Sequence, residues 1–123
     1  MPMGEAEATL RLALQNEGFG ILTEVDVQAT LRAKLGIETP PHRLLGACNP
    51  KIAHAAIEAQ PAVGAFLPCG IAIRQGATPE ETLVSLQNPA LMASLFEVPG
   101  LTEAARDAEL RLTAALESVG APL

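Results

Sequence analysis

The chain has 123 residues, of which 49% are hydrophobic but only three are aromatic, so Leu, Ile, Val and Ala must build its core. Its formal net charge is −6 and its Lys and Arg residues are scattered, which argues against nucleic acid or an anionic membrane as a partner. It has no signal-peptide pattern and no apolar run near the roughly 18 residues of a membrane span, so we expect one cytoplasmic domain over residues 1–123 whose two cysteines stay reduced.

The first elements follow from helical spacing and capping signals. Apolar residues predict a helix over residues 5–16, and Gly18 suits the cap at its C-terminal end. A strand over residues 20–25 follows. Asp26 is then expected to cap a second helix over residues 27–35, because its carboxylate can accept hydrogen bonds from the free amides of the first turn. This helix is expected to bury Val27, Leu31 and Leu35.

The middle of the chain predicts two more strands and a helix between them. The strand over residues 43–48 leads into Asn49-Pro50, a pair that starts helices because Asn caps and Pro lacks an amide that would have no partner. The third helix is expected over residues 50–59, with an inner face of Ile52, Ala53, Ala56 and Ile57. A strand over about residues 66–74 follows, with one face formed by Leu67, Cys69, Ile71 and Ile73. Pro68 cannot donate to a ladder, so we expect this strand to be at an edge or bulged there.

The last third of the chain predicts one strand and two helices. A strand over residues 81–86 is close enough to the third strand for an antiparallel hairpin. Asn88-Pro89 repeats the capping pattern and starts a short helix that ends near Phe96, and Pro99-Gly100 is expected to break it. The final helix is expected over residues 102–119, with an apolar face of Ala105, Ala108, Leu112, Ala115, Leu116 and Val119.

These elements predict an α+β fold with about four strands in a mainly antiparallel sheet and helices packed on one face. The alternation of strands and helices in the first half also permits crossover connections. The other face of such a sheet would be partly bare. Because a bare face or edge in a small domain often pairs with a second copy, we expect a homodimer.

Several segments resemble one known family in order and spacing: residues 18–27, Lys34-Leu35-Gly36, residues 45–50, Ala53-His54 and Leu67-Pro68-Cys69. The chain resembles the bacterial and archaeal domain of unknown function 302 over roughly residues 10–86. The resemblance implies a TBP-like α+β fold of the β-α-β(4)-α type that is dimeric, and it implies no activity. This chain departs from the family in having Gly70 where Asn is more usual, and in having too few and too polar residues before Glu5 for the first strand of the family. We therefore expect that strand to be missing.

The candidate site is formed by the two segments that hold the only cysteines, Cys48 and Cys69. If the second and third strands are neighbours, the two sulfur atoms can approach each other. Cys48 stands just before a capped helix, whose N-terminal amides favour a thiolate and lower the thiol pKa. Such a thiolate could be a nucleophile, a redox thiol or a soft-metal ligand. The alternative is that Cys48 fills the strand–helix junction and that Cys69 is an inert core residue.

Four other polar residues each have a functional and a structural interpretation. His54 lies on the polar face of its helix, one turn before Glu58, and is either half of a surface pair or a base or ligand near Cys48. Asp26 and Glu24 could serve acid–base chemistry or hold a hard metal ion, although capping already explains Asp26. Asn49 is a capping residue first.

We therefore predict a dimeric module that binds a small ligand or acts as an accessory protein, and not an enzyme, because no complete catalytic constellation is present. Its pocket is expected to be lined by Cys48, Asn49, Pro50, Pro68 and Cys69, with His54 and Asp26 nearby. Two alternatives stay open: a thiol-dependent redox or metal-binding protein that uses Cys48 and Cys69, and a purely structural dimer unit. Of the residues that could hold a metal ion, we retain Cys48 and Cys69 as candidates, and the sequence identifies no cofactor.

Overall fold

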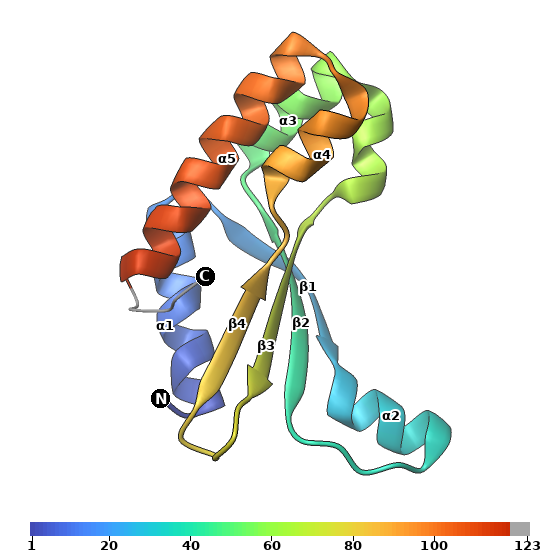
Figure 1. Cartoon of the computed structure of the whole chain (residues 1–123), viewed down its shortest axis with the longest axis vertical. Helices are drawn as coiled ribbons and strands as arrows, with labels where there is room; N and C mark the ends of the chain where they lie inside the picture. Colours follow the sequence, from blue (N-terminus) through green and yellow to red (C-terminus); the bar gives the residue numbers. More distant parts are fainter. Residues whose placement is uncertain (119–123) are drawn as a thin grey trace.

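The computed structural model describes residues 1–118 and contains one four-stranded sheet with helices around it (Figure 1). The elements in chain order are α1 (Met3–Asn16), β1 (Gly20–Asp26), α2 (Val27–Leu35), β2 (His42–Cys48), α3 (Pro50–Ala59), the 3₁₀ helix η1 (Pro61–Phe66), β3 (Cys69–Gln75), β4 (Thr82–Leu86), α4 (Pro89–Phe96) and α5 (Pro99–Ser118). The strand order is β1-β2-β3-β4 and every pair is antiparallel. The predicted α+β sheet is confirmed, and no crossover connects the strands of this sheet.

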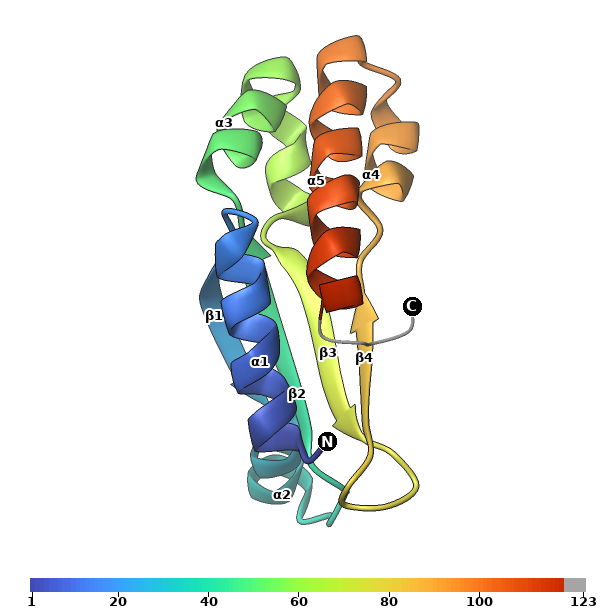
Figure 2. The same cartoon turned by 90° about the vertical axis from the view of Figure 1, so that its left-hand side faces the viewer.

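All helices except α2 lie on one face of the sheet or beyond one of its ends. In Figure 2, α1 and α5 run in front of the sheet. The helices α3, η1 and α4 gather around the first half of α5 beyond the end of the sheet, and α2 projects from the opposite end (Figure 1). Among residues 1–118, no helix combines the length and the hydrophobicity needed to cross a membrane.

The buried side chains form two clusters that share α5. The first cluster lies between the sheet, α1 and α5 and contains Leu10, Ala13, Leu14, Phe19, Leu45, Ala47, Ile71, Ile73, Ala108, Leu112, Ala115 and Leu116. The second lies among α3, η1, α4 and α5 and contains Ala56, Val63, Met92, Ala93, Leu101, Ala104 and Ala105. Because α5 contributes to both, it joins the sheet to the group of helices beyond its end.

Local capping explains where most helices begin and end. Asp26, Asn49 and Asn88 each accept a hydrogen bond from a backbone amide of the following turn, as predicted. Gly18 and Gly36 follow α1 and α2 with φ of 86° and 65°, a left-handed conformation that costs Gly little. The predicted bounds of α2 and α3 and the predicted end of α4 therefore agree with the structure to the residue.

Two predicted inner faces are wrong in part. None of the residues of α2 is buried, and Leu35 is 67% exposed, because α2 lies beyond the end of the sheet and no other helix of residues 1–118 packs over it. On α3, Ala56 is buried but Ile57 is exposed. Helical spacing identifies residues that share a face, but it does not show whether another element covers that face.

The third strand and the last helix also begin at other residues than predicted. β3 begins at Cys69, so Pro68 precedes the strand and removes no ladder hydrogen bond, and β3 lies in the middle of the sheet instead of at an edge. Pro99 is the first residue of α5 and does not break a helix. At the first position of a helix, the missing amide hydrogen of Pro costs nothing because an amide there has no partner within the helix. The predicted apolar face of α5 is buried over its five described members, and Val119 lies outside the described residues.

An ion-pair network fastens α1 to the first two strands. Glu7 accepts hydrogen bonds from Arg11, at 3.1 Å, and from Arg43 of β2, at 2.6 Å. Glu24 of β1 pairs with the same two guanidinium groups: Arg11 donates a hydrogen bond to it, and an Arg43 nitrogen lies 3.5 Å away. The two carboxylates and two guanidinium groups thus link one helix to two strands.

This network should make stability sensitive to acid. The hydrogen bond from Arg11 lowers the pKa of Glu24 below its ordinary value of 4.5. A carboxylate whose pKa is lower in the folded chain stabilises the fold above the unfolded-state pKa, and that contribution is lost as the pH falls below about 4.5 and through the folded pKa. In thermal unfolding followed by circular dichroism, Glu24→Gln should therefore flatten part of the decline in melting temperature at low pH. The control is Glu103→Gln, an exposed carboxylate outside the network, and an unchanged decline in Glu24→Gln would contradict the prediction.

Candidate functional site

The sheet brings the two cysteines to one crevice. Cys48 is the last residue of β2 and Cys69 is the first residue of β3, and these neighbouring strands pair with Ala47 opposite Cys69. Both cysteines line a crevice whose other walls come from α3, α5 and the strand ends: Phe19, Ala47, Asn49, Ile52, Ala53, Ala56, Leu67, Ala104, Ala105 and Ala108. The second and third strands are therefore neighbours, which is the condition that the prediction for the two cysteines required.

The crevice is too small for an organic ligand. Its volume is about 20 Å³. A buried water needs roughly 10–15 Å³ of such space, whereas sites for small molecules usually occupy about 300–1,000 Å³. A crevice of this volume therefore suits one water molecule or one ion.

The surroundings of the two cysteines favour neutral thiols. Both cysteines are free, and burial raises the pKa of the Cys48 thiol. Burial also raises the pKa of Cys69, and the nearby Cys48 adds to that effect. This is opposite to the lower pKa expected from the N-terminus of α3. One reason is that the side chain of Asn49 already accepts from the Ile52 amide, at 3.2 Å, and so satisfies part of that terminus.

Asn49 holds two helices together. It is only 8% exposed, and its amide nitrogen donates a hydrogen bond to the carbonyl oxygen of Glu17, at 3.3 Å, while its oxygen caps α3. A Cβ atom on Gly18 would lie 2.8 Å from that nitrogen, so Gly18 leaves room for this contact as well as adopting a positive φ. Both polar ends of the Asn49 side chain are therefore engaged in joining the end of α1 to the start of α3.

Two of the predicted pocket residues face elsewhere. Pro50 is exposed at the start of α3. Pro68 packs over Gly46, where a Cβ atom would lie 2.5 Å from the Pro68 ring and would also overlap the hydroxyl of Thr23. Neither proline lines the cysteine crevice.

His54 and Asp26 are not near the cysteines' crevice either. The His54 Nε2 atom lies 3.6 Å from a Glu58 oxygen on the exposed side of α3, so the two form a surface pair. Asp26 lies at the opposite end of β1 from the residue that pairs with Cys48, which is Gly20. Gly20 and Asp26 are six positions apart in β1, roughly 20 Å along the sheet. The prediction that Asp26 lies near the pocket is therefore wrong.

Two larger grooves flank α5, and the sequence did not predict them. The first lies between α3 and α5, has a volume of about 650 Å³, and includes the predicted residues Asn49 and Pro50. Its charged residues carry both signs: Lys51, Glu103, Asp107 and Arg111. Asp107 and Arg111 form the surface pair expected from their spacing, at 2.9 Å.

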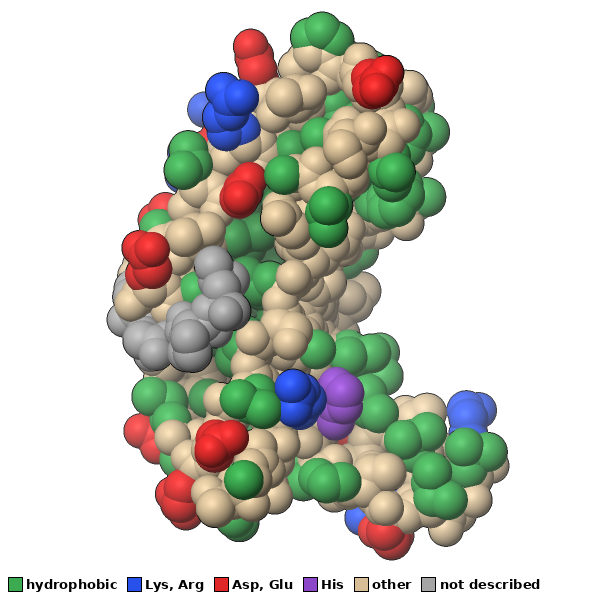
Figure 3. All heavy atoms as spheres, in the orientation of Figure 1, with side chains coloured by type: hydrophobic (Ala, Val, Ile, Leu, Met, Phe, Trp, Pro, Cys, Tyr) green, Lys and Arg blue, Asp and Glu red, His purple; other side chains and the backbone are tan. Residues whose placement is uncertain are grey.

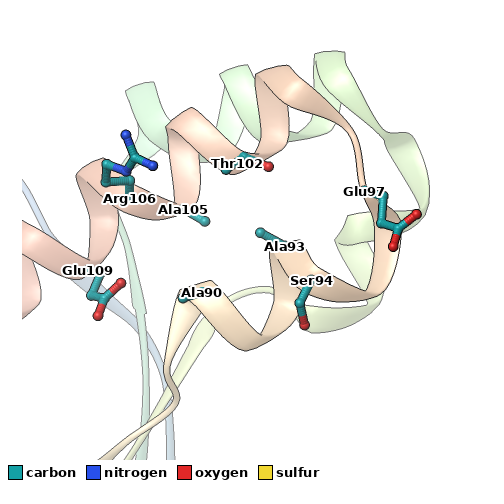
Figure 4. A pocket seen from close by; sticks show the side chains of 8 residues that line it. All are labelled: Ala90, Ala93, Ser94, Glu97, Thr102, Ala105, Arg106 and Glu109. Carbon is teal, nitrogen blue, oxygen red and sulfur yellow. The ribbon is translucent and has the colours of Figure 1, made fainter.

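The second groove lies between α4 and α5 and has a volume of about 480 Å³. Figure 4 shows Ala93 and Ala105 facing each other across it, with longer polar side chains such as Arg106 and Glu97 directed away from its centre. Small residues at helical spacing on α4 and α5 were the available signal, but they indicate only that two helices approach each other. Among residues 1–118, no group of three or more His, Cys, Asp or Glu side chains is placed to hold a metal ion.

Comparisons with known proteins agree on one family. None of the curated proteins compared with the chain matches it. The crystal structure of an uncharacterized conserved DUF302 protein from Bacillus stearothermophilus is 32% identical to it, with a TM-score of 0.86, and the match covers 95% of this chain and 90% of that one. The family model described as "Domain of unknown function DUF302" matches residues 1–119, which includes α1 and α5 beyond the motifs seen in the sequence. The chain therefore belongs to the DUF302 family.

Proposed function

We propose that the protein acts as a homodimeric accessory module in which the uncovered face of the sheet meets the same face of a second copy. The observation that carries this proposal is a row of aliphatic residues on that face. Val25, Leu44 and Ala72 are direct neighbours across β1, β2 and β3, and Val25 and Leu44 are 44% and 41% exposed. No helix of residues 1–118 lies over this row, because α1 and α5 cover the other face (Figure 2).

The exposed helix α2 extends the same apolar surface. In Figure 3 the molecule is hollowed between the upper helices and α2, and hydrophobic side chains lie along the hollow and on α2. Leu35 and, just after the helix, Ile37 are exposed large hydrophobic residues. A helix of nine residues is marginal on its own in water, and α2 buries none of its residues within the chain. A covering surface on a partner would stabilise it.

A second copy suits this surface better than a small partner does. In a two-fold contact each copy presents the same patch, so each copy would cover both the sheet face and α2 of the other. The sheet face measures roughly 20 Å by 20 Å, or about 400 Å², from the usual strand rise and spacing. A standard interface takes about 800 Å² from each partner. The sheet alone supplies about half of that area, so the proposed interface includes α2.

The test is the mass of the protein in solution, measured by sedimentation velocity. The wild-type protein should have twice the 12.8 kDa mass of the chain, and Leu44→Arg should reduce it to a monomer because a buried, unpaired charge opposes the contact. The matched control is Leu110→Arg, because Leu110 is the same residue type, is 65% exposed against 41% for Leu44, and lies on α5, away from the sheet face. A monomeric wild-type protein, or a Leu44→Arg dimer as stable as the control, would refute the proposal.

The proposal also includes a small-ligand site, action in the cytoplasm and a TBP-like fold. The groove between α3 and α5 suits small-ligand binding better than the cysteine crevice, since about 650 Å³ lies within the usual range for such sites and its walls offer both charge signs. Action in the cytoplasm suits a chain with two free cysteines. We also retain the TBP-like arrangement of the sheet as part of this proposal.

A further inference from the structure

The groove between α3 and α5 is narrow at one end and wider at the other. The two helices pack together and run in opposite directions (Figure 2). Where α3 ends and α5 begins they are in contact, because a Cβ atom on Gly100 would lie 3.2 Å from the Cβ atom of Ala59. Toward the start of α3 they leave the groove of about 650 Å³, which Ile52, Ala55 and Ala104 line with apolar surface.

The charged side chains of this groove are sorted by sign along its length. A helix rises about 1.5 Å per residue, so the Cα atom of Glu103 lies about 4–5 Å along α5 from the contact at Gly100. On the opposite wall, Lys51 lies about 12 Å along α3 from the same contact at Ala59. Arg111 lies farther along α5, at about 16 Å. An acidic group therefore lies near the narrow end and basic groups lie near the wide end.

The charges of Lys51 and Glu103 are available to a ligand. Within the described residues 1–118, neither side chain forms an ion pair. Asp107 and Arg111, which lie beside them in the groove, pair with each other at 2.9 Å. Their side chains are about half exposed, and an exposed pair of this kind contributes little free energy, so it can exchange partners at small cost.

We propose that this groove binds a dipeptide with free termini, with its ammonium group beside Glu103 and its carboxylate beside Lys51. This inference rests on the proposed function, which includes a small ligand in the same groove. Glu103 and Lys51 lie about 7 Å apart along the groove. Two extended residues span about 7 Å, whereas the two charges of a single amino acid are separated by only one Cα atom.

The lining between the two charges selects the side chains of the peptide. Ile52, Ala55 and Ala104 offer no polar side-chain atom there, so small or aliphatic side chains suit this part of the groove. Recognition would thus combine two opposite charges at the ends with apolar contact between them. No covalent bond forms or breaks.

The test is an NMR titration of the full ¹⁵N-labelled chain with the dipeptide L-alanyl-L-leucine. The backbone amide signals of Ala55 and Ala104 should shift, because both residues line the groove. N-acetyl-alanyl-leucine lacks the ammonium group, and alanyl-leucinamide lacks the carboxylate. Each should bind about five-fold more weakly than the free dipeptide, which is the size expected for the loss of one exposed ion pair. Leucine alone should also bind more weakly.

Two variants test which end of the peptide meets which residue. Lys51→Met should weaken binding of alanyl-leucine about five-fold but leave binding of alanyl-leucinamide unchanged, because that probe has no carboxylate to lose a partner. Glu103→Gln should weaken alanyl-leucine in the same way and leave N-acetyl-alanyl-leucine unchanged. The matched controls are Lys34→Met and Glu5→Gln, since both residues are exposed and lie outside the groove.

Three results would overturn the inference. The first is that the blocked peptides bind as tightly as the free one, which would leave a ligand groove that does not recognise the termini. The second is that Lys51→Met and Glu103→Gln bind alanyl-leucine as tightly as their controls do. The third is that the peptide shifts no amide of the groove. Each result is independent of the dimer, which sedimentation velocity tests separately.

Discussion

Gly46→Val should be the most damaging single substitution considered for this protein. Gly46 is buried in β2, and a Cβ atom there would overlap the Thr23 hydroxyl of β1 and lie 2.5 Å from the Pro68 ring. The Thr23 hydroxyl can turn away by rotation of its side chain, but the Pro68 ring is rigid and cannot, so the overlap with Pro68 remains. Overpacking usually costs about 1–3 kcal/mol and sometimes more. Valine adds three carbon atoms at this point, so we expect a loss of at least about 3 kcal/mol.

The measurement is urea unfolding followed by far-UV circular dichroism, because the chain has neither Trp nor Tyr to report by fluorescence. The matched control is Gly20→Val: Gly20 also lies in a strand, but a Cβ atom there would meet nothing within 4 Å. We expect Gly20→Val to change the free energy of unfolding by less than about 1 kcal/mol, since β-branched residues suit strands. Equal losses in the two variants would show that the crowding around Gly46 is not the cause.

Leu112→Ala should produce the second large loss of stability, of about 2–5 kcal/mol. Leu112 is 2% exposed and lies in the first core cluster, where α5 packs toward α1 and the sheet. The expected cost combines the lost burial of the side chain and the cavity that remains.

The control for this substitution is Leu110→Ala on the same helix. Leu110 is 65% exposed, so its truncation should change the free energy of unfolding by less than about 0.5 kcal/mol. Urea unfolding of both variants measures the difference directly. A loss from Leu112→Ala no larger than that from Leu110→Ala would mean that α5 does not pack on the sheet as described.

Local signals made most element boundaries predictable. Asp26, Asn49 and Asn88 act within one turn of backbone, so their effect can be read without knowing the rest of the fold. The family was also identifiable, because its motifs combine such caps with the two cysteine segments. The α+β class followed from the same order of elements.

The sequence could not show how the helices and strands are placed relative to one another in space. The apolar spacing of α2 suggested a buried helix, but no element of residues 1–118 covers Leu35. Asp26 and Cys48 lie in adjacent strands, and only the register shows that they are at opposite ends. The size of the cysteine crevice depends on how closely α3 and α5 approach the sheet, which no local pattern encodes.

The packing of α1 toward α5 has a consequence for how the chain is made on the ribosome. The first core cluster takes Leu10 and Leu14 from the first helix and Leu112 and Leu116 from the last. The four strands can pair with their chain neighbours as they emerge, since their order in the sheet is their order of synthesis. Their inner face nevertheless stays without α5 until synthesis has passed residue 116. A nascent chain therefore exposes an apolar sheet face, and such exposed surfaces bind chaperones and promote aggregation.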